Sequence, residues 1–218
     1  MSDVISVASF TVAMAALATL VMLPPGVGVA WLLARRRFPG RAVLETLVSL
    51  PLVLPPVATG LILLKLIGRR GPVGAVLERF GIDLVFTWRA VVLAMAVMGL
   101  PLLVRAAREG FEQVDRRYEQ IAATLGASPA RVFFSVSLPL ARRGVLAGAL
   151  LGFSRALGEF GATILVAGAL PSTRTIAVAI YSYTETGQEA AATTMLLVSA
   201  TIAFGALMLS NRVAASAP

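Results

Sequence analysis

Five long apolar runs, separated by segments that carry most of the arginines, constrain the fold of this chain. The runs lie at about residues 7–34, 42–67, 90–104, 144–170 and 190–209. A helix needs about 20 apolar residues to cross a bilayer. Because lipid offers no hydrogen-bond partners, the backbone of a spanning segment must form its hydrogen bonds internally, as a helix does. The mean hydropathy is +0.87, which means that the chain has more apolar side chains than a soluble domain of 218 residues could bury beneath a polar surface. The sequence therefore predicts an all-α polytopic membrane protein, with residues 1–218 forming one transmembrane domain of five helices.

Absent residue types narrow the possible functions. The chain has no Cys and no His, which removes thiol chemistry, imidazole acid–base catalysis and the commonest zinc sites. Its single lysine, Lys65, does not belong to a GxxxxGK[ST] phosphate-binding loop. We therefore expect no catalytic site, no metal and no cofactor bound by this chain. A membrane-embedded enzyme would need converging reactive groups that the spans do not offer.

The distribution of cationic residues predicts the orientation in the membrane. On the side of residues 109–143 lie Arg35, Arg36, Arg37, Arg41, Arg105, Arg108, Arg116, Arg117, Arg131, Arg142, Arg143 and Arg212; the opposite side has Lys65, Arg69, Arg70, Arg79, Arg89 and Arg174. Cytoplasmic loops carry the excess of positive charge in membrane proteins. The sequence thus predicts a plasma-membrane protein with its N-terminus outside and its C-terminus in the cytoplasm. The net charge of +8 is explained by this anchoring, so we expect no nucleic-acid binding.

The second run contains three prolines, Pro51, Pro55 and Pro56. Proline inside a helix removes a backbone hydrogen bond and costs roughly 3 kcal/mol in water. Membranes tolerate such breaks only against protein or a wet cavity, and broken helices often mark transport routes. We expect this span to face the interior of an assembly, with a simple packing kink as the alternative.

The fourth run contains an intramembrane charge pair, Arg155 and Glu159. Residues four apart share one face of a helix. Each charge alone would cost on the order of 3 kcal/mol near the bilayer centre, so pairing allows both to remain. A structural clamp is the favoured interpretation, and a place on a transport route is the alternative.

Residues 109–143 form a polar segment between the third and fourth runs. Tyr118 to Leu125 is a run of helix formers that ends at Gly126, whose freedom at positive φ suits a helix stop. Ser128 can then cap a second helix with Pro129 at its first position. The sequence predicts two short helices that meet at a glycine elbow.

This segment resembles the EAA loop of permease subunits in ABC importers. In that family a Glu-Ala-Ala triplet is followed after three residues by Gly, and after nine more by an aliphatic residue, a spacer and Leu-Pro. Here the triplet position holds Gln120, Ile121 and Ala122, Glu119 stands one place early, and Gly126, Val136, Leu138 and Pro139 fall on spacing. The resemblance implies that this loop, Ala127 included, couples the permease to a cytoplasmic ATPase. An ordinary amphipathic loop is the alternative.

Further segments resemble permeases of the molybdate, or ModB, type. They are LPLVLPP (50–56), GRRG (68–71), FTWRAVVLAMAVMGLPL (86–102), RVFFSVSLPL (131–140) and RALGEFGAT (155–163). The resemblance implies a homodimer in the lipid bilayer, two cytoplasmic ABC ATPase subunits that bind ATP and Mg, and an extracytoplasmic oxyanion-binding protein. Tungstate and sulfate permeases are close relatives and remain alternatives. A non-transporting scaffold would explain the spans but not the spaced loop.

Overall fold

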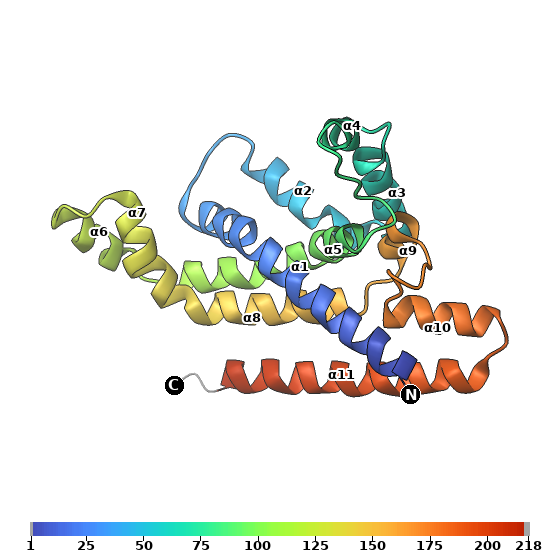
Figure 1. Cartoon of the computed structure of the whole chain (residues 1–218). Coiled ribbons are helices and arrows are strands. Elements are labelled where there is room, and N and C mark those ends of the chain that lie inside the picture. The colour runs from blue at the N-terminus through green and yellow to red at the C-terminus, as the bar shows by residue number, and fades with distance from the viewer. Residues whose placement is uncertain (1, 216–218) are drawn as a thin grey trace.

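The computed structural model describes residues 2–215, with side chains described for residues 3–208, and it contains helices and no strand in that range (Figure 1). Arg212 lies outside the described side chains. The helices are α1 Ser2–Arg35, α2 Arg41–Val53, α3 Pro56–Ile67, α4 Pro72–Glu78, α5 Trp88–Gln113, α6 Arg116–Thr124, α7 Pro129–Val132, a π-helical turn Phe133–Ser137, α8 Leu138–Leu157, α9 Gly161–Ala167, α10 Ile176–Glu185 and α11 Glu189–Ala215.

The lengths and hydropathies of these helices confirm the membrane assignment. Among the described residues, four helical stretches are long and apolar enough to cross a bilayer: α1, α5, the continuous rod from α7 to α8, and α11. The pair α2 and α3 provides a fifth span if it is counted as one element bent by 117°. The polytopic all-α fold predicted from the five apolar runs is therefore confirmed.

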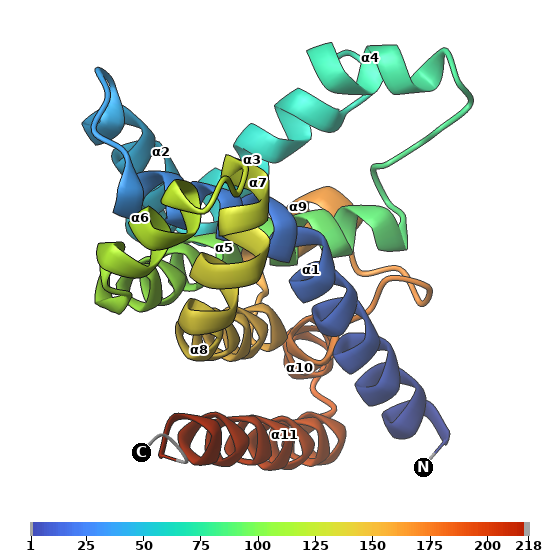
Figure 2. The same cartoon turned by 90° about the vertical axis from the view of Figure 1, so that its left-hand side faces the viewer.

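Helix α5 lies at the centre of the molecule and packs against both α1 and α8 (Figure 1 and Figure 2). Its buried face includes Ala90, Ala94, Met95 and Met98, which form the main core with residues of α1, α3 and α9. The α5 and α8 backbones approach so closely that a Cβ on Gly144 would lie 2.5 Å from the Cα of Gly110. Small residues permit this kind of helix contact in lipid.

Two helices differ in extent from the predicted spans. Helix α5 continues past residue 104, the predicted end of the third span, to Gln113, and Arg108 pairs with Glu112 at 2.7 Å across one helical turn. The predicted loop at 109–143 therefore begins with the end of α5. The fourth span is not one helix over 144–170, because α8 ends at Leu157 and α9 begins at Gly161.

The predicted proline break in the second span is confirmed. Pro51 lies within α2, whereas Pro55 caps α3 and Pro56 is its first residue, where a missing N–H costs no hydrogen bond. None of the residues of α2, all of which are described, is buried. A 2.6 Å ion pair between Arg108 and Glu45 ties α2 to α5.

The segments expected outside the membrane also contain short helices. In the segment after α3, Arg69 donates hydrogen bonds to Asp83, which raises the pKa of the Arg69 guanidinium above its ordinary value. The apolar stretch 176–180 belongs to α10, which buries Ile176 against α1 and α11. The N-terminus of α1 lies at the end of the molecule opposite α6, and the last turns of α11 point toward the α6 end (Figure 1).

Candidate functional site

The glycine elbow predicted in the segment between α5 and α8 is present in the structure. Helix α6 begins after Asp115, whose side chain accepts a 2.9 Å hydrogen bond from the Arg117 N–H. At its other end Gly126 has φ +83°, its N–H donates to the Ala123 carbonyl, and the Ala127 N–H donates to the Ala122 carbonyl. These two bonds form a Schellman motif, which requires the left-handed residue that glycine supplies.

The chain resumes its helical course directly after the elbow. Ser128 accepts a hydrogen bond from the Arg131 N–H, and Pro129 is the first residue of α7, as predicted. The π-helical turn then leads into α8, which begins at Leu138 with Pro139 in its first turn. Single π turns inside helices occur frequently at functional sites. Residues 129–157 thus form one continuous helical rod that begins three residues after the elbow glycine.

The outer side of α6 presents an exposed apolar face. Tyr118 and Ile121 are each 57% exposed and Leu125 is 83% exposed, and their spacing places them on the same side of the helix. Between this face and the start of α8 lies an open groove of about 470 Å³, lined by Tyr118, Ile121, Ala122, Leu125, Ser135, Val136, Pro139 and Leu140. A contiguous exposed apolar surface of this kind is typical of a site of interaction with a protein or a membrane.

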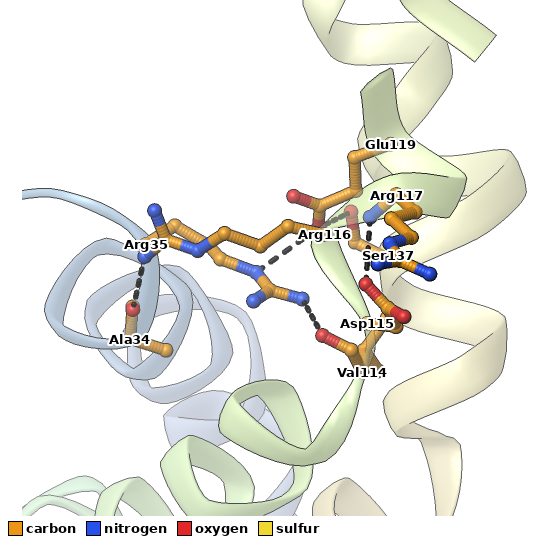
Figure 3. Close-up of polar contacts among 8 residues, drawn as sticks. All are labelled: Ala34, Arg35, Val114, Asp115, Arg116, Arg117, Glu119 and Ser137. Atoms are coloured by element: carbon orange, nitrogen blue, oxygen red, sulfur yellow. Dashed lines mark hydrogen bonds and ion pairs between the residues drawn. The ribbon is translucent and has the colours of Figure 1, made fainter. Parts of the chain in front are cut away.

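The inner side of α6 is polar and is held by Glu119 (Figure 3). The Glu119 carboxylate pairs with the Arg35 guanidinium at 3.0 Å and accepts a 2.7 Å hydrogen bond from the Ser137 hydroxyl. Arg35 also donates a 2.8 Å hydrogen bond to the carbonyl of Val114. Gln120, which occupies the family's Glu position by spacing, is exposed to solvent. The Glu119 carboxylate therefore binds groups of its own chain, whereas the Gln120 side chain is exposed to solvent.

Other predicted site residues lie elsewhere. Ala127 borders a second cavity, of about 280 Å³, which is also lined by Arg36, just after α1, and by Arg116, the first residue of α6. Arg116 crosses to α1 and donates a 3.5 Å hydrogen bond to the carbonyl of Ala34 (Figure 3). The elbow residues thus lie together around α6, whereas Pro55 and Pro56 at the start of α3 and the pair Arg155–Glu159 next to α9 lie in another part of the molecule (Figure 1).

The intramembrane pair lies where α8 gives way to α9. Arg155 contacts one oxygen of Glu159 at 2.8 Å, and the other oxygen accepts a 2.8 Å hydrogen bond from the Ala162 N–H in the first turn of α9. The Glu159 side chain is 1% exposed, whereas that of Arg155 is 25% exposed. Glu159 therefore links the end of α8 to the start of α9.

The charge pair and the proline break are neighbours in space. A Cβ on Gly161 would lie 2.8 Å from the Cβ of Pro56, so α9 and α3 touch at their first residues. Each broken span is thus packed against the other at its break. The sequence indicated the proline break and the charge pair separately. Their contact could not be predicted from local sequence, because it joins segments about 100 residues apart.

Arg35 is the functional candidate that sequence reasoning missed. It stands in the triplet Arg35-Arg36-Arg37, whose only apparent purpose in the sequence is to mark a cytoplasmic span end. Its partner Val114 is 79 positions away in the chain. No pattern within the triplet distinguishes Arg35 from its two neighbours.

Comparisons with known proteins agree with this arrangement. Residues 26–214 match the family described as binding-protein-dependent transport system inner membrane component. The molybdenum transport system permease protein ModB of Escherichia coli K12 is 48% identical over 89% of this chain and 86% of its own length. ModB of Haemophilus influenzae is 44% identical over 95% of this chain and 92% of its own length.

Solved structures of ABC transporters share the fold. An inward-facing MetNI methionine transporter chain superposes with a TM-score of 0.76 at 16% identity, covering 99% of this chain and 96% of that chain. A chain of a bacterial transporter that imports alginate gives 0.66 at 17% identity, covering 97% and 80%. From the family match and the identity to its relatives, the chain belongs to the binding-protein-dependent transport system inner membrane components and, among them, to the ModB-type permeases.

Proposed function

We propose that this chain is the permease subunit of an ATP-driven importer and that it forms the membrane route for molybdate. The substrate rests on the relatives, since proteins 44–48% identical over most of the chain are named molybdenum transport permeases. The coupling to ATP rests on one structural observation, which is the exposed apolar face of α6 made by Tyr118, Ile121 and Leu125.

A cytoplasmic ATPase is the partner that this face fits. The chain has no phosphate-binding loop of its own, so ATP and Mg would be bound by the partner. The α6 face adjoins an open groove, whereas Arg35, Arg36 and Arg116 line the separate cavity on the other side of α6. In a homodimer, each permease would bind one ATPase through its helix α6, which we call the coupling helix. The two coupling helices would then move together and apart as the ATPase pair closes and opens.

This function implies an orientation for the chain. The α6 end, where Arg35, Arg36 and Arg116 gather, would lie in the cytoplasm. The N-terminus and α4 would lie outside, where a binding protein delivers the oxyanion. The second copy would cover part of the apolar surface of α2 and α11, and Arg155, which is 25% exposed at membrane depth, would face that copy or the route.

Selection of the ion would take place mainly in the binding protein. Arg155 is already paired with Glu159, and the Glu159 carboxylate would repel a dianion. A route for a strongly hydrated ion must also bind weakly enough to release it. The permease would then act as a permissive path that opens alternately to each side.

Leu125→Asp is expected to abolish capture of the ATPase. An unpaired carboxylate buried in an apolar contact costs well over 1.4 kcal/mol, so affinity should fall by about tenfold or more. The measurement is co-purification of the ATPase with tagged permease from membranes. Val76→Asp is the control, because Val76 is 51% exposed on α4, away from α6. Equal ATPase recovery from both variants would contradict docking at this face.

A further inference from the structure

Arg35 differs from its neighbours in the arginine triplet that ends α1. Its side chain is 7% exposed, whereas Arg36 and Arg37 are exposed. A marker of the cytoplasmic side of a membrane needs only to be charged and hydrated. A guanidinium withdrawn from water must instead have partners that compensate for its lost hydration.

The partners of Arg35 come from three other parts of the chain. They are the Val114 carbonyl just beyond α5, the Glu119 carboxylate of α6 and, through that carboxylate, the Ser137 hydroxyl at the start of α8. We call this set, Arg35, Val114, Glu119 and Ser137, the Arg35 junction (Figure 3). The cation also lies at the C-terminal end of α1, where a helix dipole favours positive charge.

Helix α6 has one other hydrogen bond to α1, the exposed 3.5 Å bond from Arg116 to the Ala34 carbonyl, which is longer than those of the Arg35 junction. None of its nine residues, all of which are described, is buried. It is joined to α5 through Val114 and Asp115, which are both extended, and to α7 through the glycine elbow. Neither link is a continuous helix. Each could therefore bend when α6 moves, so that α5 and α7 would not have to move with it.

We propose that Arg35 is a positioning residue that fixes the coupling helix α6 to α1. A displacement of α6 by the ATPase would then move α1 and the ends of α5 and α8 as one body, because the Arg35 junction joins all four. This inference rests on the proposed function, since it assigns a mechanical role within ATPase coupling. A residue needed only for folding would lower the amount of complex and leave its efficiency unchanged.

The experiment compares Arg35→Gln with the matched variant Arg37→Gln in the reconstituted complex of permease, ATPase and binding protein. Both variants remove one positive charge from the same triplet. Recovery of the ATPase, basal ATP hydrolysis, and molybdate uptake per ATP hydrolysed are measured for each. We expect Arg35→Gln to retain the ATPase and its basal rate within about twofold, and to lose about tenfold in uptake per ATP. Arg37→Gln should match the wild type.

Two further variants sharpen the test. Arg35→Lys keeps the charge but lacks the planar fork that reaches Glu119 and the Val114 carbonyl together, so it should recover only part of the efficiency. Glu119→Gln should reproduce the Arg35→Gln defect, and the double variant should be no worse than either single one, because both act through one contact.

The result that would overturn the inference is an unchanged uptake per ATP in Arg35→Gln. If that variant fails to assemble, Arg35→Lys decides in its place, and a wild-type ratio in that variant overturns the inference. The wild-type complex separates this failure from failure of the proposed function. Absence of ATPase binding or of stimulated hydrolysis in the wild type counts against the function itself, whereas a coupled wild type with an equally coupled Arg35→Gln counts only against the role of Arg35.

Discussion

Replacement of Gly126 by valine is expected to uncouple ATP hydrolysis from transport and to lower molybdate uptake by about tenfold or more. Gly126 has φ +83°, a conformation that a β-branched residue adopts only at a cost on the order of 1–3 kcal/mol. Two hydrogen bonds that stop α6 depend on this conformation. Their loss would turn the apolar face of α6 away from its partner. Uptake into proteoliposomes, together with ATPase recovery, provides the measurement.

Gly126→Asn is the matched control for this prediction. Nothing lies within 4 Å of a Cβ built at Gly126, so a larger side chain is not excluded by space. Asparagine tolerates the left-handed region far better than valine, and the asparagine variant should therefore retain most of the activity. If Gly126→Val binds the ATPase and transports molybdate as the wild type does, the elbow has no part in coupling.

Replacement of Glu159 by glutamine is expected to destabilise the chain severely. The substitution can preserve the hydrogen bond that Ala162 donates, but it leaves the Arg155 charge without its partner. Breaking a buried ion pair costs roughly 3–5 kcal/mol, which is a large part of a total stability of about 5–15 kcal/mol. Yield and thermal unfolding of the purified permease in detergent should both fall.

The double variant Arg155→Gln with Glu159→Gln tests whether the lost charge balance is the cause. The double variant removes both charges, so that no uncompensated ion remains. It should therefore be more stable than Glu159→Gln alone. Normal assembly of Glu159→Gln with a change only in apparent affinity for molybdate would instead place Glu159 on the transport route.

The features that could be predicted from the sequence are those set by local chemistry or by the membrane. Lipid requires long apolar helices, so the five runs indicated the spans directly. The elbow follows from Gly126, Ser128 and Pro129, whose conformational preferences act within a few residues. The break at Pro55 follows from the geometry of proline.

The features that could not be predicted depend on contacts between distant segments. The extension of α5 to Gln113 brings Gly110 into close contact with Gly144 of α8. The break between α8 and α9 is stabilised by the Glu159 cap and by contact with α3, in a stretch whose apolar composition alone suggests one long helix. The burial of Arg35 depends on Glu119 and Val114, which come close only when α1, α5 and α6 assemble.

ATP hydrolysis by the complex reconstituted in lipid, measured with and without its binding protein and molybdate, most directly tests whether this chain couples an ATPase to oxyanion import. We expect the ATPase to remain bound to the permease and its rate to rise severalfold, by about threefold or more, only when the binding protein carries molybdate. Molybdate should accumulate inside the vesicles in proportion to the ATP consumed. A permease that retains no ATPase, or a hydrolysis rate that is the same with and without the loaded binding protein, would contradict this function.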